Sequence, residues 1–160
     1  MYTEGGYHYS SSFIKKGMIK MKVLIKDSIN IERIKETISN FKFNSNGVCD
    51  LVASNIADDL SKIGYMKSSE YDVILDIIPD TEFLSEIIGC YELKIISSNN
   101  IPHKVIDIYN TKFEYQFTID IPYTLYEEPF YKGSELRWKC LDSYINLNKE
   151  NIIFYKRGEL

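Results

Sequence analysis

One stretch of the sequence constrains the fold more than any other, because it predicts an amphipathic helix that begins at a cysteine. Between Val52 and Ile63 apolar residues recur at three- and four-residue steps, the pattern of one buried helical face. Asp50 lies in the predicted first turn, where the helix dipole favours negative charge, and Gly64 stands where a left-handed cap would end the helix. We therefore expect a central helix with one face against the core and Cys49 at its start.

The position of Cys49 has two interpretations. A helix N-terminus carries partial positive charge, which stabilises a thiolate, lowers its pKa and makes it nucleophilic near neutral pH. Cysteine is also one of the most commonly buried residues, and often it only packs. The choice between these interpretations depends on whether a base lies beside the thiol.

The composition is that of an ordinary globular protein, with 44% hydrophobic and 26% charged residues. At 160 residues we expect one domain over residues 18–160, preceded by an irregular arm over residues 1–17. The net charge of −4 argues against a dominant nucleic-acid surface, which needs a basic face. No apolar run approaches the ~20 residues of a membrane span, and no signal-peptide pattern is present. We expect a cytoplasmic protein, or an effector delivered without a classical signal peptide.

The three cysteines are Cys49, Cys90 and Cys140. An odd number of cysteines indicates free thiols in a reducing compartment, and their spacings match no zinc-binding pattern. Neither histidine lies near a cysteine in the sequence. We therefore expect no metal site and no cofactor.

The rest of the sequence predicts helices first and antiparallel strands after them, which is an α+β domain. Turn residues at 97–102 and 110–112 separate three short β-rich runs, and the second turn predicts a tight hairpin. The expected helices cover residues 28–41, capped by Asp27 or Ser28, 49–63, 82–88 and 134–145. The expected strands cover residues 18–26, 71–78, 91–97, 103–109, 113–119 and 151–155.

A nucleophilic cysteine needs a base to take its proton and a third group to orient that base. His103 begins the first strand of the predicted hairpin, and Asp120 closes the second. In a hairpin the start of one strand lies beside the end of its partner. If the Cys49 helix places its N-terminus over that edge, the three residues form a Cys–His–Asp triad. Asp107 is a competing acid, although it lies within a strand of the hairpin.

Three short motifs follow one another in this order: Gly-Val-Cys at residues 47–49, His-Lys-Val-Ile-Asp-Ile at 103–108, and Phe-Thr-Ile-Asp at 117–120. Over residues 46–123 they resemble the core of papain-like and transglutaminase-like cysteine enzymes. That superfamily places its cysteine at the start of a central helix, its histidine at the start of a following strand and its acid at the end of the next. It includes thiol proteases, transglutaminases, deamidases and acyltransferases, among them bacterial effector toxins. Lys104 departs from the pattern, because relatives often have a small or aromatic residue after the histidine.

The resemblance implies an acyl-transfer enzyme that acts on an amide or thioester of a protein or peptide substrate. Cys49 would attack the carbonyl, His103 would act as base and then acid, and Asp120 would orient His103. Hydrolysis, deamidation and transfer all remain open, because they share this chemistry. No glutamine precedes the cysteine as an oxyanion donor, so Asn44 or Asn46 is the candidate for that role.

The alternative is a non-enzymatic binding protein, such as an immunity protein or a phage-type inhibitor. Such a protein would act through an aromatic and acidic surface, and the 13 tyrosines and net negative charge fit it equally well. The two hypotheses differ at Cys49. An enzyme needs this thiol beside His103, whereas a binding protein is expected to bury it among aliphatic side chains. The oligomeric state is left open.

Overall fold

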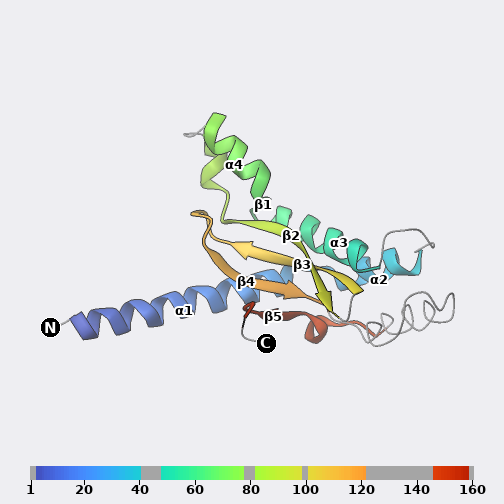
Figure 1. Cartoon of the computed structure of the whole chain (residues 1–160), viewed down its shortest axis with the longest axis horizontal. Helices are drawn as coiled ribbons and strands as arrows, with labels where there is room; N and C mark the ends of the chain where they lie inside the picture. Colours follow the sequence, from blue (N-terminus) through green and yellow to red (C-terminus); the bar gives the residue numbers. More distant parts are fainter. Residues whose placement is uncertain (1–2, 41–47, 78–81, 99–100, 122–145, 159–160) are drawn as a thin grey trace.

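The chain folds into a central sheet with helices packed on it (Figure 1), and the computed structural model describes residues 3–40, 48–77, 82–98, 101–121 and 146–158. The helices are α1 (Thr3–Ser28), α2 (Ile31–Ser39), α3 (Val48–Lys62), α4 (Ser68–Ile77), α5 (Glu82–Ser85) and the short 3-10 helix η3 (Lys149–Asn151). The strands are β1 (Tyr65–Lys67), β2 (Gly89–Ser98), β3 (Ile101–Tyr109), β4 (Tyr115–Asp120) and β5 (Ile153–Tyr155).

The strands follow the chain order across the sheet, β1-β2-β3-β4-β5. β1 runs parallel to β2, and the other three pairings are antiparallel. The turn between β3 and β4 is closed by Asn110, whose side-chain oxygen accepts hydrogen bonds from the backbone N–H groups of Lys112 and Glu114. This hairpin aligns Ile106 with Ile119, so that the beginning of β3 lies beside the end of β4.

The core lies between the sheet and the first three helices. α3 buries Val52, Ala53, Ile56 and Leu60, and steps of three and four residues from Val52 or Ala53 to Ile56 and on to Leu60 place them on one helical face. Isoleucines of α2 and the end of α1 complete the helical side of this core, which packs against aliphatic and aromatic side chains of β3 and β4. The sheet residues of the core include Ile106, Ile108, Phe117 and Ile119.

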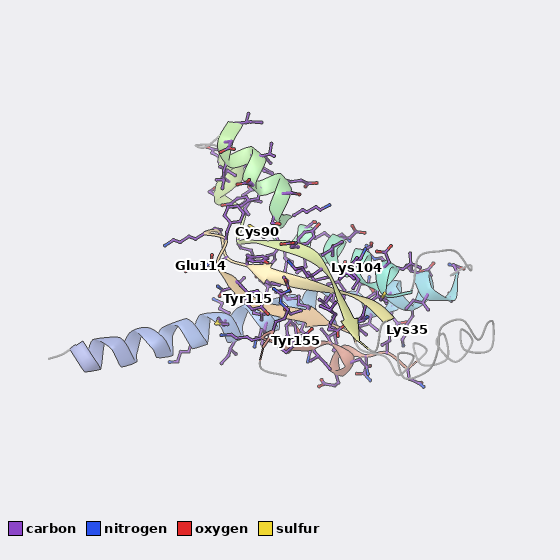
Figure 2. The ribbon with its side chains drawn as sticks, in the orientation of Figure 1. Lys35, Cys90, Lys104, Glu114, Tyr115 and Tyr155 are labelled. Atoms are coloured by element: carbon purple, nitrogen blue, oxygen red, sulfur yellow. The ribbon has the colours of Figure 1, made fainter. Side chains whose placement is uncertain are left out.

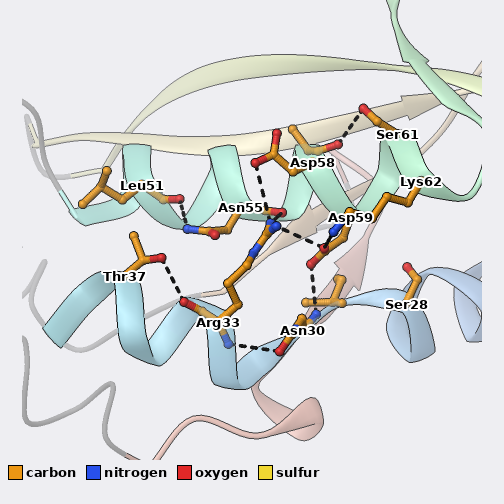
Figure 3. A network of polar contacts seen from close by, with 12 residues as sticks. Ser28, Asn30, Arg33, Thr37, Leu51, Asn55, Asp58, Asp59, Ser61 and Lys62 are labelled. Atoms are coloured by element: carbon orange, nitrogen blue, oxygen red, sulfur yellow. Dashed lines mark hydrogen bonds and ion pairs between the residues drawn. The ribbon is translucent and has the colours of Figure 1, made fainter. Parts of the chain in front are cut away.

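A polar network joins α2 to α3 (Figure 3). Asn30 caps α2 by accepting a hydrogen bond from the Arg33 backbone N–H, and its own N–H donates to Asp59 Oδ2 at 2.9 Å. Arg33 Nη2 donates to the carbonyl oxygen of Asn55 at 2.7 Å and lies 3.4 Å from Asp59 Oδ1. Because the Asp59 side chain is 3% exposed, its charge depends on these partners rather than on water.

The α+β class predicted from the sequence is confirmed. The helix expected over 49–63 is α3, and the strands expected over 91–97, 103–109, 113–119 and 151–155 correspond to β2, β3, β4 and β5 within a few residues. The expected helix over 28–41 is α2, but Asn30 is its cap, because Asp27 and Ser28 belong to the end of α1. The helix expected over 134–145 lies outside the described residues.

Two predicted strands are wrong. Residues 18–26 are part of α1, which also includes residues 3–17, where an irregular arm was expected. Met18, Met21 and Ile25 are three and four residues apart, and this helical spacing turns them towards the core. Residues 71–77 lie in α4, of which Tyr71 is the buried residue.

The sheet and the end of the expected helix over 82–88 also differ from the prediction. The sheet is mixed rather than antiparallel, because β1, which was not predicted, pairs in parallel with β2. α5 ends at Ser85, and Gly89 begins β2 instead of capping a helix. A Cβ at Gly89 would lie 2.6 Å from the Tyr109 carbonyl oxygen, so the close approach of β2 to β3 requires glycine here. Among the described residues, no helix has the length and apolar character needed to cross a membrane.

The network between α2 and α3 leads to a stability prediction. Asp59→Ala removes the acceptor of the Asn30 N–H and the ion-pair partner of Arg33, and we expect it to lower the free energy of unfolding by about 2–3 kcal/mol. Asp58→Ala is the matched control, since the Asp58 side chain is 70% exposed and lies 3.7 Å from the same Arg33 nitrogen. Its effect should stay within about 0.5 kcal/mol. Urea unfolding followed by circular dichroism measures both, and equal effects would contradict the prediction.

Candidate active site

Cys49 is the second residue of α3 and is half-buried. The first turn of a helix presents backbone N–H groups and the positive end of the helix dipole, which favour a negative charge on a nearby atom. The helix is held in this position by its apolar face, because Val52 and Ile56 pack against the core formed with β3 and β4. The thiol is therefore fixed relative to the sheet by α3 and not by a loop.

His103 and Asp120 lie side by side at one end of the β3–β4 hairpin. His103 is the third residue of β3 and Asp120 is the last residue of β4. His103 Nε2 and Asp120 Oδ1 are 2.6 Å apart, and the side chains are 7% and 13% exposed. The antiparallel register produces this proximity, because it places the beginning of one strand against the end of the next.

The Cys49 side chain interacts with the same histidine. His103 interacts with the Cys49 side chain through a hydrogen bond and through the negative charge on the sulfur, and the two residues line one pocket together with Asp120. Apart from these residues and Lys104, the wall of this pocket is aliphatic, formed by α3, β3 and β4. The structure thus brings together all three residues that the sequence predicted as a triad, although their catalytic roles stay a prediction.

The surroundings of His103 favour its charged form. Burial of the ring lowers the pKa, but the hydrogen bonds to Asp120 and Cys49 and the negative charges of both residues outweigh burial. As a result the pKa of His103 is raised from 6.5 to about 9. An imidazolium at neutral pH is the partner that a neighbouring thiol needs to ionise.

A second ion pair lies beside the first. Lys104 Nζ donates to Asp50 Oδ1, and the two side chains are 24% and 31% exposed. Lys104 is the residue after His103, and Asp50 is the residue after Cys49, so the pair ties the first turn of α3 to the beginning of β3. Sequence reasoning noted both residues separately but missed their contact. The signal available for it was their position next to the two residues expected to meet.

The competing acid, Asp107, belongs to a different group of side chains. Its Oδ1 accepts a hydrogen bond from Thr118 Oγ1 at 2.8 Å. Its Oδ2 lies 2.9 Å from Arg157 Nη1 in an ion pair without hydrogen-bond geometry. Asp107 is fully buried, and Asp120 is the carboxylate bonded to His103.

The two oxyanion candidates, Asn44 and Asn46, lie outside the described residues. Among the residues that the structure does describe, no three His, Cys, Asp or Glu side chains are grouped so that they could hold a metal ion. Of the other cysteines, Cys90 is fully buried in β2 (Figure 2), and burial raises the pKa of its thiol to about 11. Cys90 therefore serves as an internal control for the reactivity of the half-buried Cys49.

Comparisons with known proteins do not add to this picture. No protein-family model, no curated protein and no solved structure matches the chain.

The raised pKa of His103 predicts how stability depends on pH. The stabilisation by the imidazolium is fully present below pH 6.5, the ordinary pKa, and is lost as the pH rises through about 9. The difference in unfolding free energy between the natural protein and a His103→Gln variant should therefore be largest near pH 6 and shrink towards pH 9.5. Urea unfolding at several pH values measures it.

The same measurement in a Cys49→Ala background distinguishes the contributions of Cys49 and Asp120 to the raised pKa of His103. There the decrease should begin at lower pH, because one contribution to the raised pKa is gone, while Asp120 still favours the charged ring. A difference that is constant with pH, or one that grows with pH, would contradict the prediction.

Proposed function

We propose that this protein is a cysteine-dependent acyl-transfer enzyme that acts on an amide or thioester of a protein or peptide. The observation that carries the proposal is the contact of His103 with both Asp120 and Cys49 at the first turn of α3. The arrangement has the three parts of a nucleophilic site: a nucleophile, a base and a group that orients the base. It is similar to the site of papain-like and transglutaminase-like enzymes, which the order of motifs in the sequence also resembles.

The two nitrogens of His103 have different tasks in this proposal. Asp120 bonds to Nε2, so Nδ1 is the nitrogen that exchanges a proton with the Cys49 sulfur. The carboxylate keeps the ring in one orientation and stabilises its positive charge. The same charge, together with the N-terminus of α3, favours the thiolate of Cys49.

In the first step the thiolate attacks the substrate carbonyl carbon. A carbon–sulfur bond forms and the carbonyl π electrons move to the oxygen, which gives a tetrahedral intermediate. When the electrons return, the bond to the leaving amine or thiolate breaks, and the leaving group takes the proton from His103. The acyl group is then held on Cys49 as a thioester.

In the second step the neutral imidazole of His103 takes a proton from an acceptor, which is water or an amine. The acceptor forms a bond to the acyl carbon, and the carbon–sulfur bond breaks to return the Cys49 thiolate. Water as acceptor gives hydrolysis or deamidation, whereas an amine gives transfer.

A small activated ester tests for the acyl-enzyme without knowledge of the natural substrate. We expect p-nitrophenyl acetate at pH 7 to add one acetyl group to Cys49, located by peptide mass spectrometry, and to release nitrophenol in a burst. Asp120→Asn should slow this acetylation by about tenfold or more, because the histidine loses its charge partner.

Two variants serve as controls for this experiment. Cys49→Ala should abolish the burst, while Cys90→Ala should leave it unchanged, because the Cys90 thiol is buried and stays protonated. If acetylation occurs at surface lysines but not at Cys49, or if Asp120→Asn acetylates at the natural rate, the enzyme proposal is wrong. The alternative of a non-enzymatic binding protein would then stand.

The Lys104–Asp50 pair is proposed as a positioning device for Cys49. Lys104→Met keeps the length of the side chain but removes the link between α3 and β3, so we expect iodoacetamide to alkylate Cys49 several-fold more slowly at the pH plateau. The free energy of unfolding should change by less than about 1 kcal/mol, as for other partly exposed pairs.

The matched control is Lys94→Met, which breaks the partly exposed ion pair between Lys94 and Glu92, two residues apart on β2. Its alkylation rate should equal that of the natural protein. A role of Lys104 through charge alone would move the midpoint of the pH–rate profile and leave the plateau unchanged, and that result would exclude positioning.

A further inference from the structure

The outer face of α1 combines exposed apolar and basic side chains. Ile19 and Val23 are 61% and 54% exposed, although isoleucine and valine usually lie inside. Lys16 and Lys20 are exposed on the same side of the helix, and neither has an ion-pair partner among the described side chains. We call these four residues the basic face of α1.

A face of opposite charge lies on α4. Val73 and Ile77 are 53% and 70% exposed, and the carboxylates of Asp72 and Asp76 stand beside them without an ion-pair partner in the described structure. We call these four residues the acidic face of α4. The surrounding sequence, residues 68–88, contains six acidic residues and no lysine or arginine.

The two faces match in spacing as well as in charge. Each has one apolar pair and one charged pair, and both pairs are four residues apart, so each face shows two short stripes along its helix. The apolar stripes of the two helices therefore have the same length, and so do the two charged stripes. An apolar stripe loses water when it is covered, and opposite charges beside it select the partner and its orientation.

The two faces do not meet within one molecule. α4 packs beside β1 and β2, at one edge of the sheet. α1 lies near β4 instead, where its Lys22 is over the ring of Phe117. In Figure 1 the N-terminal part of α1 extends away from the sheet at the lower left, and α4 stands at the top. Within one molecule, therefore, neither face covers the other.

We propose that the occupant of each face is a second copy of this chain, with the basic face of α1 in one molecule packed on the acidic face of α4 in the other. When the same contact forms in both directions, a two-fold symmetric dimer buries all four faces. The lysines of each molecule then lie against the aspartates of its partner. Because the contact is partly electrostatic and at the surface, added salt weakens it.

Sedimentation velocity of the full chain over a concentration series tests the proposal. The natural protein at low salt should approach twice the mass of one chain as its concentration rises. Lys16→Glu/Lys20→Glu should remain monomeric, and so should Asp72→Lys/Asp76→Lys. The control Lys112→Glu/Lys156→Glu changes the same charge at exposed positions away from α1 and should dimerise normally.

Mixing the two monomeric variants gives the decisive result. In the mixture an acidic α1 meets a basic α4, and a basic α1 meets an acidic α4, so we expect a heterodimer that neither variant forms alone. Combining all four substitutions in one chain should restore the homodimer. Because all six changed positions are exposed, circular dichroism should show an unchanged fold for each variant.

Three results would overturn the proposal. The first is a natural protein that is monomeric over the whole concentration series. The second is a mixture of the two variants that stays monomeric although each is folded. The third is binding of the monomeric protein to phosphatidylserine vesicles that is lost in Lys16→Glu/Lys20→Glu, because the basic face would then bind lipid headgroups.

Discussion

The packing of α3 across β3 is the contact on which the rest of the structure depends. The apolar face of α3 lies against the core between the helices and the sheet, and its first turn reaches the beginning of β3. The core side chains determine the distance between α3 and the sheet. The Lys104–Asp50 pair links the first turn of α3 to the beginning of β3. Apolar burial supplies the stability of this packing, and the positioning role proposed for the ion pair adds alignment rather than stability.

Three buried carboxylates each have a cationic partner close by. Asp59, Asp107 and Asp120 are all largely buried, and each has its own cation or hydrogen-bond donor: Arg33, Arg157 and His103, respectively. When one member of such a pair is replaced, the other is left as an uncompensated buried charge, which destabilises the folded protein. Each pair therefore favours the particular packing of the two elements that it joins. The first joins two helices, the second joins β3 to the residues after β5, and the third joins two neighbouring strands.

Sequence reasoning located the site better than it located the elements around it. The turn residues at 97–102 define where β3 begins, and those at 110–112 join β3 to β4 in a tight hairpin. Together they predict that His103 and Asp120 are neighbours. The periodicity and the glycine at the end of the helix likewise define α3. The runs at 18–26 and 71–78 contain mostly apolar residues in short blocks, and such blocks fit a strand or a helix equally well until the core to be covered is known. The parallel strand β1 has three residues, too few for any periodicity.

The location of the site at the ends of two strands has a further consequence. Terminal rungs of a β-ladder open more often than central rungs, because fewer hydrogen bonds must break at once. His103 is the third residue of β3 and Asp120 the last of β4, so fraying of this end of the sheet separates the imidazole from its carboxylate. The core residues Ile108 and Phe117 are paired further along the same hairpin, and we expect them to stay paired during such an opening. We therefore expect the site to come apart in a local transition of lower free energy than global unfolding, so that mild heating or dilute denaturant separates the two side chains while the fold persists.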